Sequence, residues 1–536
     1  MYQWIFICGI FFALYNAWGI GANDCANSFA TSVGSGVLTL RKAVVIAAIF
    51  EFGGAVLMGS HVTDTVRKSI VDIEIFNSNP GALMFGMLCA DLASAIWLTL
   101  ATYLKYPVST THSIIGAIVG FSLAYGGRDA VDWKKIGFIV LSWIASPLLA
   151  GIFSFGIFYV IQIFIFGSKK PFEYTMVLFP ILTFFTFFIN VLFIIYKGSP
   201  KLDLDEMELW KCMLISIGIG SFTALLAQYV YLPYVKRRLK ENVEENQIEN
   251  GENQIEMLGI RTNSYIKANK AITIETPGES NTDEEDAIVP VRVNNKNYTY
   301  DNSKTIEFNI NESKKYTSQL ENEKLNTEVA ELHQNAIDID KKSDQLCSWL
   351  QIITACFSSF AHGSNDVANA IAPLATIYAI YKNGYLSDKA EVPIWILVLG
   401  GVGIVIGLGT WGYKIIDRIG KELTKITPSR GFVIELAAAT TVIIASRAEI
   451  PVSTTHCQVG SVLGCGMAGG IKNIKWSLVR GILFSWLITL PFTGLLSAAL
   501  FSFGYYSPYS DYIAPFFNSS GVNMSGFDSG SGSIEL

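Results

Sequence analysis

Charged residues are scarce in most of this chain. Only 16% of the 536 residues are Asp, Glu, Lys or Arg, whereas 51% are hydrophobic. A soluble protein carries about a quarter of its residues as charges. The shortage is uneven, because residues 235–345 hold 15 of the Lys and Arg residues and 22 of the Asp and Glu residues. The remainder is nearly neutral and apolar, which indicates a membrane protein, not a soluble enzyme, and leaves no basic surface for nucleic acid.

Paired cysteines are also lacking. The eight cysteines are scattered, mostly within apolar runs, and no two of them are spaced as CxxC. Cysteines in such places act as small buried hydrophobic side chains. The sequence therefore predicts no disulfide framework, no transition-metal site and no cofactor.

Long apolar runs are abundant instead. A helix needs about 20 consecutive apolar residues to cross the hydrocarbon core of a bilayer. Runs of that length include 136–166, 175–196, 211–232, 394–412 and 477–503. The first run begins at Met1 and continues into a Gly/Asn/Asp motif, without the cleavage site of a signal peptide. We expect an all-α polytopic membrane protein with about twelve transmembrane segments, some of them in re-entrant hairpins.

Composition divides the chain into four parts. Two hydrophobic halves, 1–234 and 346–505, flank the polar segment 235–345. This segment is poor in aromatic residues and cannot bury enough apolar surface to fold, so we expect a disordered loop. Basic residues from Lys236 onward, next to the end of a span, place the loop in the cytoplasm. The tail 506–536 and the N-terminus are then extracellular, in a protein that we expect in the plasma membrane.

Two short motifs occur twice, in the same order. GANDCANSFA at 21–30 returns as GSNDVANAIA at 363–372, and PVSTTH at 107–112 returns unchanged at 451–456. The connection between the motifs carries a basic cluster in the second copy, which places it inside, whereas the first connection is expected outside. We therefore expect two inverted-topology repeats, which put a substrate site at their interface near the bilayer midplane.

The Asn/Asp motif places polar side chains within an apolar span. On a helix its two Asn residues and its Asp lie on nearly one face. An intramembrane carboxylate is costly and indicates a function. Carboxylate and amide oxygens are the hard ligands that a desolvated alkali cation prefers, whereas a packed polar cluster with a protonated Asp is the alternative. The expected cation ligands are Asn23, Asp24, Asn27, Asn365, Asp366 and Asn369.

The PVSTTH motif suits an anion. Proline is favoured at the start of a helix, so the motif predicts the tip of a helical hairpin, with hydroxyl groups at the N-terminus of its second helix. Free backbone N–H groups and the positive end of the helix dipole meet at that point. Ordinary N-capping by Ser or Thr is the alternative. The expected anion ligands are Ser109, Thr110, Thr111, Ser453, Thr454 and Thr455.

Three further acids, Glu51, Asp91 and Glu435, lie inside apolar runs. The last two stand sixteen positions before the proline of each PVSTTH motif. Each is a cation ligand, a proton relay or a paired structural charge, and we expect all three to be required for transport. His112 and His456 are expected to make structural hydrogen bonds, with proton carriage as the alternative.

At these motifs the chain resembles the inorganic phosphate transporter (PiT) family, of the solute carrier 20 type. The resemblance covers both hydrophobic halves and is carried by 21–43, 107–124, 361–375 and 434–461. It implies about twelve spans with hairpins, outside termini, a long cytoplasmic loop and a homodimer.

The resemblance also implies roles for individual residues. The family's phosphate contacts correspond to the six Ser and Thr residues above, and its sodium contacts to the six Asn and Asp residues. Glu51 and Glu435 match acidic positions that are important in the family, whereas Asp91 departs from it, because Glu is expected there.

The sequence thus predicts a secondary transporter, not an enzyme, that carries inorganic phosphate together with sodium by alternating access. A proton-coupled phosphate or sulfate symporter is the alternative, because some members of the family use protons or carry sulfate. An ion channel is disfavoured, because a channel filter surrounds an oligomeric pore, whereas inverted repeats are typical of alternating access.

Overall fold

The structure is a computed structural model that describes residues 2–69, 73–196, 207–237, 339–385, 391–448 and 450–507. No β-strand occurs among these residues, and nine of their helices are long and apolar enough to cross a membrane. The prediction of an all-α polytopic membrane protein is confirmed. Most of the predicted central loop, 235–345, and most of the tail, 506–536, lie outside the described residues, so their assignment stays a prediction.

The N-terminal half forms the helices α1 to α8. They are α1 (Gln3–Asn23), α2 (Cys25–Gly34), α3 (Leu40–Ser69), α4 (Pro80–Tyr103), α5 (Thr110–Gly126), α6 (Trp133–Ile161), α7 (Pro171–Ile195) and α8 (Leu209–Leu226). Short 3₁₀ turns occur at Ile73–Phe76 and Gly127–Ala130, and π-helical turns at Gln162–Phe166 and Ala227–Tyr231.

The C-terminal half forms the helices α11 to α17. They are α11 (Lys341–Leu346), α12 (Ser348–Asn383), α13 (Ile394–Trp411), α14 (Tyr413–Asp417), α15 (Pro428–Arg447), α16 (Thr454–Ala468) and α17 (Trp476–Tyr505). A π-helical turn at Arg418–Glu422 follows α14, and a 3₁₀ turn at Ile471–Asn473 follows α16. All of these helices belong to one compact unit, Met1–Tyr229 together with Val329–Leu536.

Each PVSTTH motif forms the tip of a helical hairpin, as predicted. In the first hairpin α4 leads to α5, and in the second α15 leads to α16. The second helices have only 17 and 15 residues, fewer than the about 20 that a full span requires. Their first residues, Thr110 and Thr454, are buried. Both hairpins therefore place a helix N-terminus inside the protein.

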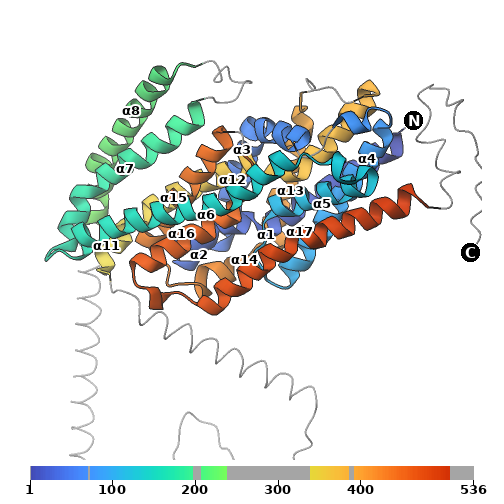
Figure 1. The fold of residues 1–536 in the computed structure, drawn as a ribbon. Helices are drawn as coiled ribbons and strands as arrows, with labels where there is room; N and C mark the ends of the chain where they lie inside the picture. Colours follow the sequence, from blue (N-terminus) through green and yellow to red (C-terminus); the bar gives the residue numbers. More distant parts are fainter. Residues whose placement is uncertain are drawn as a thin grey trace, which may run out of the picture. The chain divides into compact units, whose positions relative to one another are not determined.

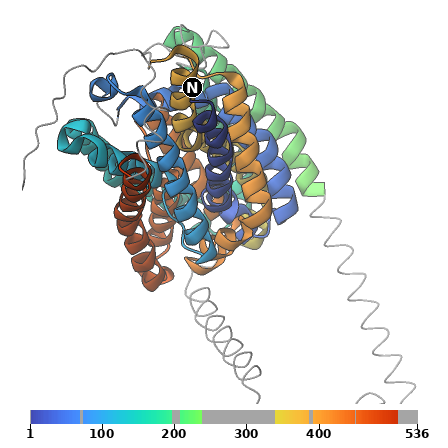
Figure 2. The same cartoon turned by 90° about the vertical axis from the view of Figure 1, so that its right-hand side faces the viewer.

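The two halves contact each other in a reciprocal pattern. α1 packs on α13 while α12 packs on α3, and α5 packs on α17 while α16 packs on α6. Figure 2 shows the N-terminal helix α1 beside α13. Glycines allow the closest approaches: a Cβ at Gly21 would lie 1.8 Å from Ile404 O, and one at Gly363 would lie 2.1 Å from Glu51 O. Because the contacts are equivalent, each repeat completes the packing of the other.

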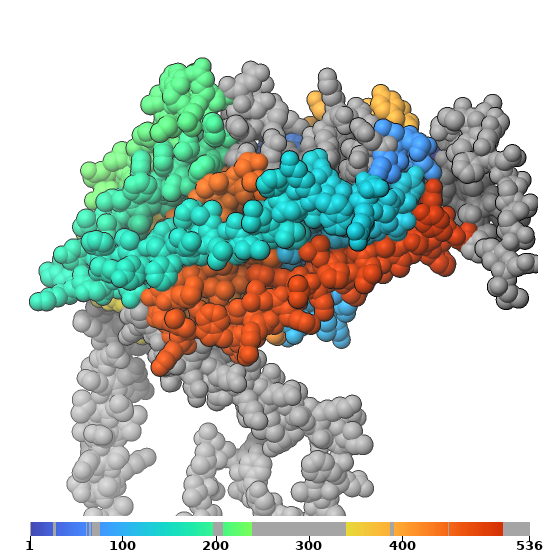
Figure 3. All heavy atoms as spheres, in the orientation of Figure 1, coloured from blue at the N-terminus to red at the C-terminus, as the bar shows by residue number. Residues whose placement is uncertain are grey.

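The repeats run in opposite directions. In Figure 1, α6 and α17, which follow the two half-helices, run along the bundle with opposite chain directions. Their outer faces lie side by side in Figure 3 and expose large hydrophobic side chains. Leu148 of α6 is 61% exposed and Leu487 of α17 is 74% exposed. A surface of this kind is stable against lipid chains and not against water, which agrees with inverted repeats within a bilayer.

Candidate functional site

The site begins at the two half-helix N-termini. Ser109 stands before α5 and accepts a hydrogen bond on Oγ from the backbone N–H of His112, at 3.2 Å. Ser453 caps α16 in the same way, accepting from His456 N at 3.2 Å. Both serine hydroxyls therefore serve their own helix, and the threonines that follow them supply the side-chain contacts described next.

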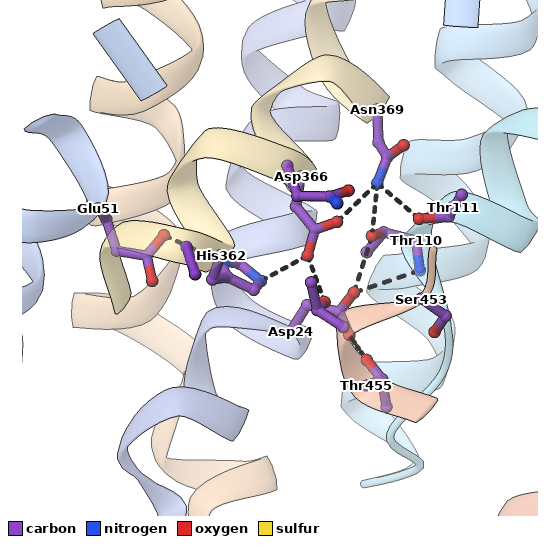
Figure 4. Close-up of polar contacts among 12 residues, drawn as sticks. Asp24, Glu51, Thr110, Thr111, His362, Asp366, Asn369, Ser453 and Thr455 are labelled. Carbon is purple, nitrogen blue, oxygen red and sulfur yellow. Dashed lines mark hydrogen bonds and ion pairs between the residues drawn. The ribbon is translucent and has the colours of Figure 1, made fainter. Parts of the chain in front are cut away.

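Asp24 is contacted by both hairpins. Thr110 donates to Asp24 Oδ2 from its hydroxyl, at 2.7 Å, and from its backbone N–H, at 3.3 Å. Thr455 of the other hairpin donates its hydroxyl to Asp24 Oδ1. All three side chains are buried. One carboxylate thus joins the first Asn/Asp motif to the half-helices of both repeats (Figure 4).

Asp366 lies on the continuous helix α12 and has a different set of neighbours. Thr454 donates its hydroxyl to Asp366 Oδ2, and Asn369 donates its amide to Oδ1 at 3.1 Å. The same amide lies 3.0 Å from Thr110 Oγ1 and 3.1 Å from Thr111 Oγ1. Asn369 therefore links the second Asn/Asp motif to the first hairpin.

The tips of the hairpins are tied to each other symmetrically. Thr111 donates its hydroxyl to Val452 O at 3.2 Å, and Thr455 Oγ1, whose proton goes to Asp24, lies at the same distance of 3.2 Å from Val108 O. These pairs stand at equivalent positions of the two PVSTTH motifs. The pseudo-twofold axis of the repeats consequently passes between the tips, where all six predicted anion ligands are gathered.

His362 is the site residue whose role the sequence motifs did not reveal. Its Nε2 lies 2.8 Å from Asp366 Oδ2, and its Nδ1 lies 2.8 Å from Glu51 Oε2. Ser359 donates to the other oxygen of Glu51, at 3.1 Å. The signal in the sequence is the spacing of His362 and Asp366, because residues four apart on a helix are neighbours.

The charges of the site are concentrated in a small volume. Asp24, His362 and Asp366 each offer one ligand atom, and these atoms lie within 4.8 Å of one another. Buried carboxylates at this separation repel each other, and a bound cation removes this cost. A cavity of about 10 Å³, which Ser358, His362, Thr454 and Gln458 help to line, adjoins the cluster.

The first asparagine of each motif points to a hairpin tip. Asn23 donates to Thr102 Oγ1 and to Tyr106 O, both at 3.0 Å, and accepts from Val108 N at 3.0 Å. Asn365 donates to Ser446 Oγ at 2.9 Å, which is the equivalent contact of the second repeat. In this arrangement both side chains hold hairpins in place. The side chain of Asn27 lies outside the described residues.

Asp91 and Glu435 lie in two separate polar pockets. Asp91 Oδ1 accepts from Asn16 Nδ2 at 3.0 Å, and that amide also lies 3.2 Å from Asn369 O. Glu435 accepts three hydroxyl groups on its two oxygens, those of Thr31, Ser32 and Thr354. The structure therefore brings only Glu51 of the three predicted acids to the central cluster, through His362.

The two histidines of the PVSTTH motifs pack behind the hairpin tips. Their ring centroids are 4.4 Å apart, and each ring lies against an indole: His112 on Trp143 at 3.7 Å, and His456 on Trp486 at 3.6 Å. His456 Nδ1 is also 3.2 Å from Trp143 O. Of the two rings, His456 makes the expected hydrogen-bonding contact, whereas neither ring nitrogen of His112 has a hydrogen-bond partner among the described residues.

Known proteins are similar to this chain over nearly its whole length. The family model described as "Phosphate transporter family" matches residues 20–497. The chain is 33% identical to sodium-dependent phosphate transporter 1 of Mus musculus and 33% identical to that of Homo sapiens, over 93% of this chain and 95% of each relative. A solved structure, "The sodium-dependent phosphate transporter", is 30% identical, with a TM-score of 0.69, over 93% of this chain and 98% of that one. This chain therefore belongs to the phosphate transporter family.

Proposed function

We propose that this chain carries inorganic phosphate together with sodium across a membrane by alternating access. The observation that carries the proposal is that threonine hydroxyls from both half-helix N-termini donate to Asp24, while Thr454 of the second half-helix donates to Asp366. The names of the relatives agree with it, because they are sodium-dependent phosphate transporters.

The hairpin tips are the part suited to phosphate. Two helix N-termini converge there, and each offers a positive dipole end, while the threonine hydroxyls are neutral donors. Neutral donors suit a transported anion, because the anion has to be released again. We propose that Thr110, Thr111, Thr454 and Thr455 contact phosphate, with Ser109 and Ser453 contributing as the caps that shape the two N-termini.

The carboxylates are the part suited to sodium. Asp24 and Asp366 are fully buried and supply hard oxygen ligands. Asn369 stands between them and the threonines, and Asn23, Asn27 and Asn365 complete the proposed sodium-binding set. Two carboxylates favour two sodium ions for each phosphate, which would make transport electrogenic.

The threonine hydroxyl protons would couple phosphate binding to sodium binding. Thr110 and Thr455 direct their hydroxyls at Asp24, and a hydroxyl has one proton to donate. Sodium bound to the carboxylate oxygens would free that proton for a phosphate oxygen. Phosphate would then bind well only after sodium, which is the condition for obligatory symport.

The proposed orientation rests on the basic residues that follow α13, up to the first turn of α15. They are Lys414, Arg418, Lys421, Lys425 and Arg430, and basic residues near span ends mark the cytoplasmic side. We propose that this connection and the loop 235–345 are cytoplasmic, that both termini are extracellular, and that the protein resides in the plasma membrane as a homodimer. The dimer rests on the family resemblance alone.

The deciding experiment is uptake of radiolabelled phosphate by proteoliposomes at fixed pH. An inward sodium gradient should drive concentrative uptake, and an inside-negative potential should increase it. Proton-driven uptake without sodium, unchanged by Asp24→Asn, would show that the coupling ion and its ligands are wrongly assigned. Sulfate competition as strong as that of phosphate would contradict the assigned substrate.

A further inference from the structure

We propose that Asp24, His362 and Asp366 also form a binding site for a divalent transition-metal ion of the Zn²⁺ type, which blocks transport by occupying the sodium position. That the metal ion displaces sodium depends on the proposed function. The metal site itself is inferred from the contacts of His362 and does not depend on that function.

The three residues have the composition and spacing of an open metal site. One nitrogen and two carboxylate oxygens lie within 4.8 Å of one another, and all three side chains are buried. Bonds of about 2 Å to a tetrahedral ion place its ligand atoms about 3.3 Å apart. Shifts of about 1 Å in the side chains would therefore close the cluster around an ion. Zinc sites with three protein ligands keep a fourth position open.

The contacts of His362 point independently to a metal. Glu51 Oε2 lies 2.8 Å from Nδ1, so when Nδ1 donates its proton to Glu51, Nε2 carries a lone pair. Nε2 is buried and is directed at Asp366 Oδ2, 2.8 Å away, in a pair without hydrogen-bond geometry, so both atoms can converge on one ion. In zinc sites a histidine that binds the metal through one ring nitrogen donates the N–H of the other to a carboxylate, which orients the ring. Glu51 stands in the position of that carboxylate here. Ser359 in turn fixes Glu51.

The ligand set selects the class of ion. Imidazole nitrogen suits Zn²⁺, Co²⁺, Ni²⁺ and Cu²⁺, whereas alkali cations prefer oxygen alone. The first repeat has Ile20 at the position of His362, so the equivalent site is not duplicated. A cavity of about 10 Å³ adjoins His362 and Thr454. Scattered cysteines predicted no transition-metal site. The site proposed here uses no cysteine, and its ligands come from both repeats.

Direct binding can be measured on the purified full-length protein in detergent and sodium-free buffer, with Co²⁺ as the spectroscopic probe. Wild type should give the visible absorption of four- or five-coordinate Co²⁺, and Zn²⁺ or high sodium should displace it. His362→Ile, which installs the residue of the first repeat, should weaken binding more than about 100-fold, and Glu51→Gln about 10- to 100-fold. His112→Gln, a buried histidine outside the cluster, is the matched control and should keep the spectrum.

Loss of the spectrum counts only in variants that stay monodisperse and keep the wild-type melting temperature. If His362→Ile fails this criterion, His362→Gln replaces it. A spectrum of full intensity in the folded His362 variant overturns the proposal, and so does a wild type that shows no such absorption with millimolar Co²⁺.

Phosphate uptake by the same proteins, reconstituted into proteoliposomes, separates the two proposals. Zn²⁺ should inhibit sodium-driven phosphate uptake by wild type, and raising sodium should shift the inhibition curve to higher zinc. If the zinc concentration for half-inhibition did not change with sodium concentration, zinc and sodium would not share a position. A wild type with the His362-dependent spectrum but no phosphate uptake would overturn the proposed function and leave the metal site in place.

Discussion

Asp24 and Asp366 occupy equivalent positions in the two repeats but have different neighbours. Asp24 lies at the junction of α1 and α2 and is held by hydroxyls from both hairpins. Asp366 lies within the continuous helix α12 and is held by Thr454, by Asn369 of its own helix and by His362. The two repeats therefore place the same acid in different surroundings.

This difference indicates a division of labour. Asp24 accepts hydrogen bonds from the neutral hydroxyls of Thr110 and Thr455, and the ligand atom of His362 lies within 4.8 Å of it. Asp366 shares its charge with a histidine that is itself backed by Glu51. We expect Asp24 to respond most strongly to sodium, and Asp366 to depend also on His362. The following predictions test the comparison, from the largest effect to the smallest.

Removing either carboxylate charge should have the largest effect. Asp24→Asn and Asp366→Asn should each lower sodium-driven phosphate uptake more than about 100-fold, because a buried cation loses its charged ligand. Asp24→Asn should change the dependence of the uptake rate on sodium concentration more than Asp366→Asn does. The measurement is initial uptake against sodium concentration, with Asp129→Asn, an exposed acid outside the site, as the control. Uptake of half the wild-type rate in either variant would contradict the shared cation site.

The threonines of the two hairpins should differ in importance. Thr455 donates to a carboxylate, whereas Thr111 donates to a backbone carbonyl, and hydrogen bonds to charged groups are about twice as strong as neutral ones. We expect Thr455→Ala to raise the KM for phosphate about 10- to 100-fold and Thr111→Ala only a few-fold. Thr223→Ala, on α8, is the control. Equal and wild-type KM values in both variants would remove the hairpins from the phosphate site.

Packing between the repeats should be equally sensitive on both sides. A Cβ at Gly120 would lie 2.0 Å from Gly494 O, and one at Gly464 would lie 2.1 Å from Gly151 O. Gly120→Ala and Gly464→Ala should each destabilise the protein by about 1–3 kcal/mol, because backbone atoms have to move. Gly137→Ala, which meets no atom within 4 Å, should not. The measurement is the melting temperature in detergent. If only one of the two substitutions lowered it, the two sides of the packing would not be equivalent.

Deleting residues 250–335 should have the smallest effect. This segment separates the repeats in the chain, and its composition predicts no folded core. Sodium-driven uptake by the inserted variant should stay within about twofold of wild type, since both copies of each motif are retained. Loss of transport in a correctly inserted variant would make the loop part of the mechanism.

Sequence patterns alone determined most of the architecture and the location of the site. Apolar length specifies membrane helices, because no other secondary structure of such composition satisfies its backbone in lipid. The repeated motifs identified the hairpin tips, the two aspartates and their threonines, because proline and capping residues act locally.

The partners of each acid were decided only by the tertiary structure. His362 bridges Glu51 of α3 and Asp366 of α12, Glu435 meets hydroxyls of α2 and α12, and Asn23 turns to a hairpin tip instead of to Asp24. Contacts of this kind join residues up to several hundred positions apart. They depend on how two inverted repeats pack around a pseudo-twofold axis, and local patterns carry no information about which side chains that packing brings within hydrogen-bonding distance.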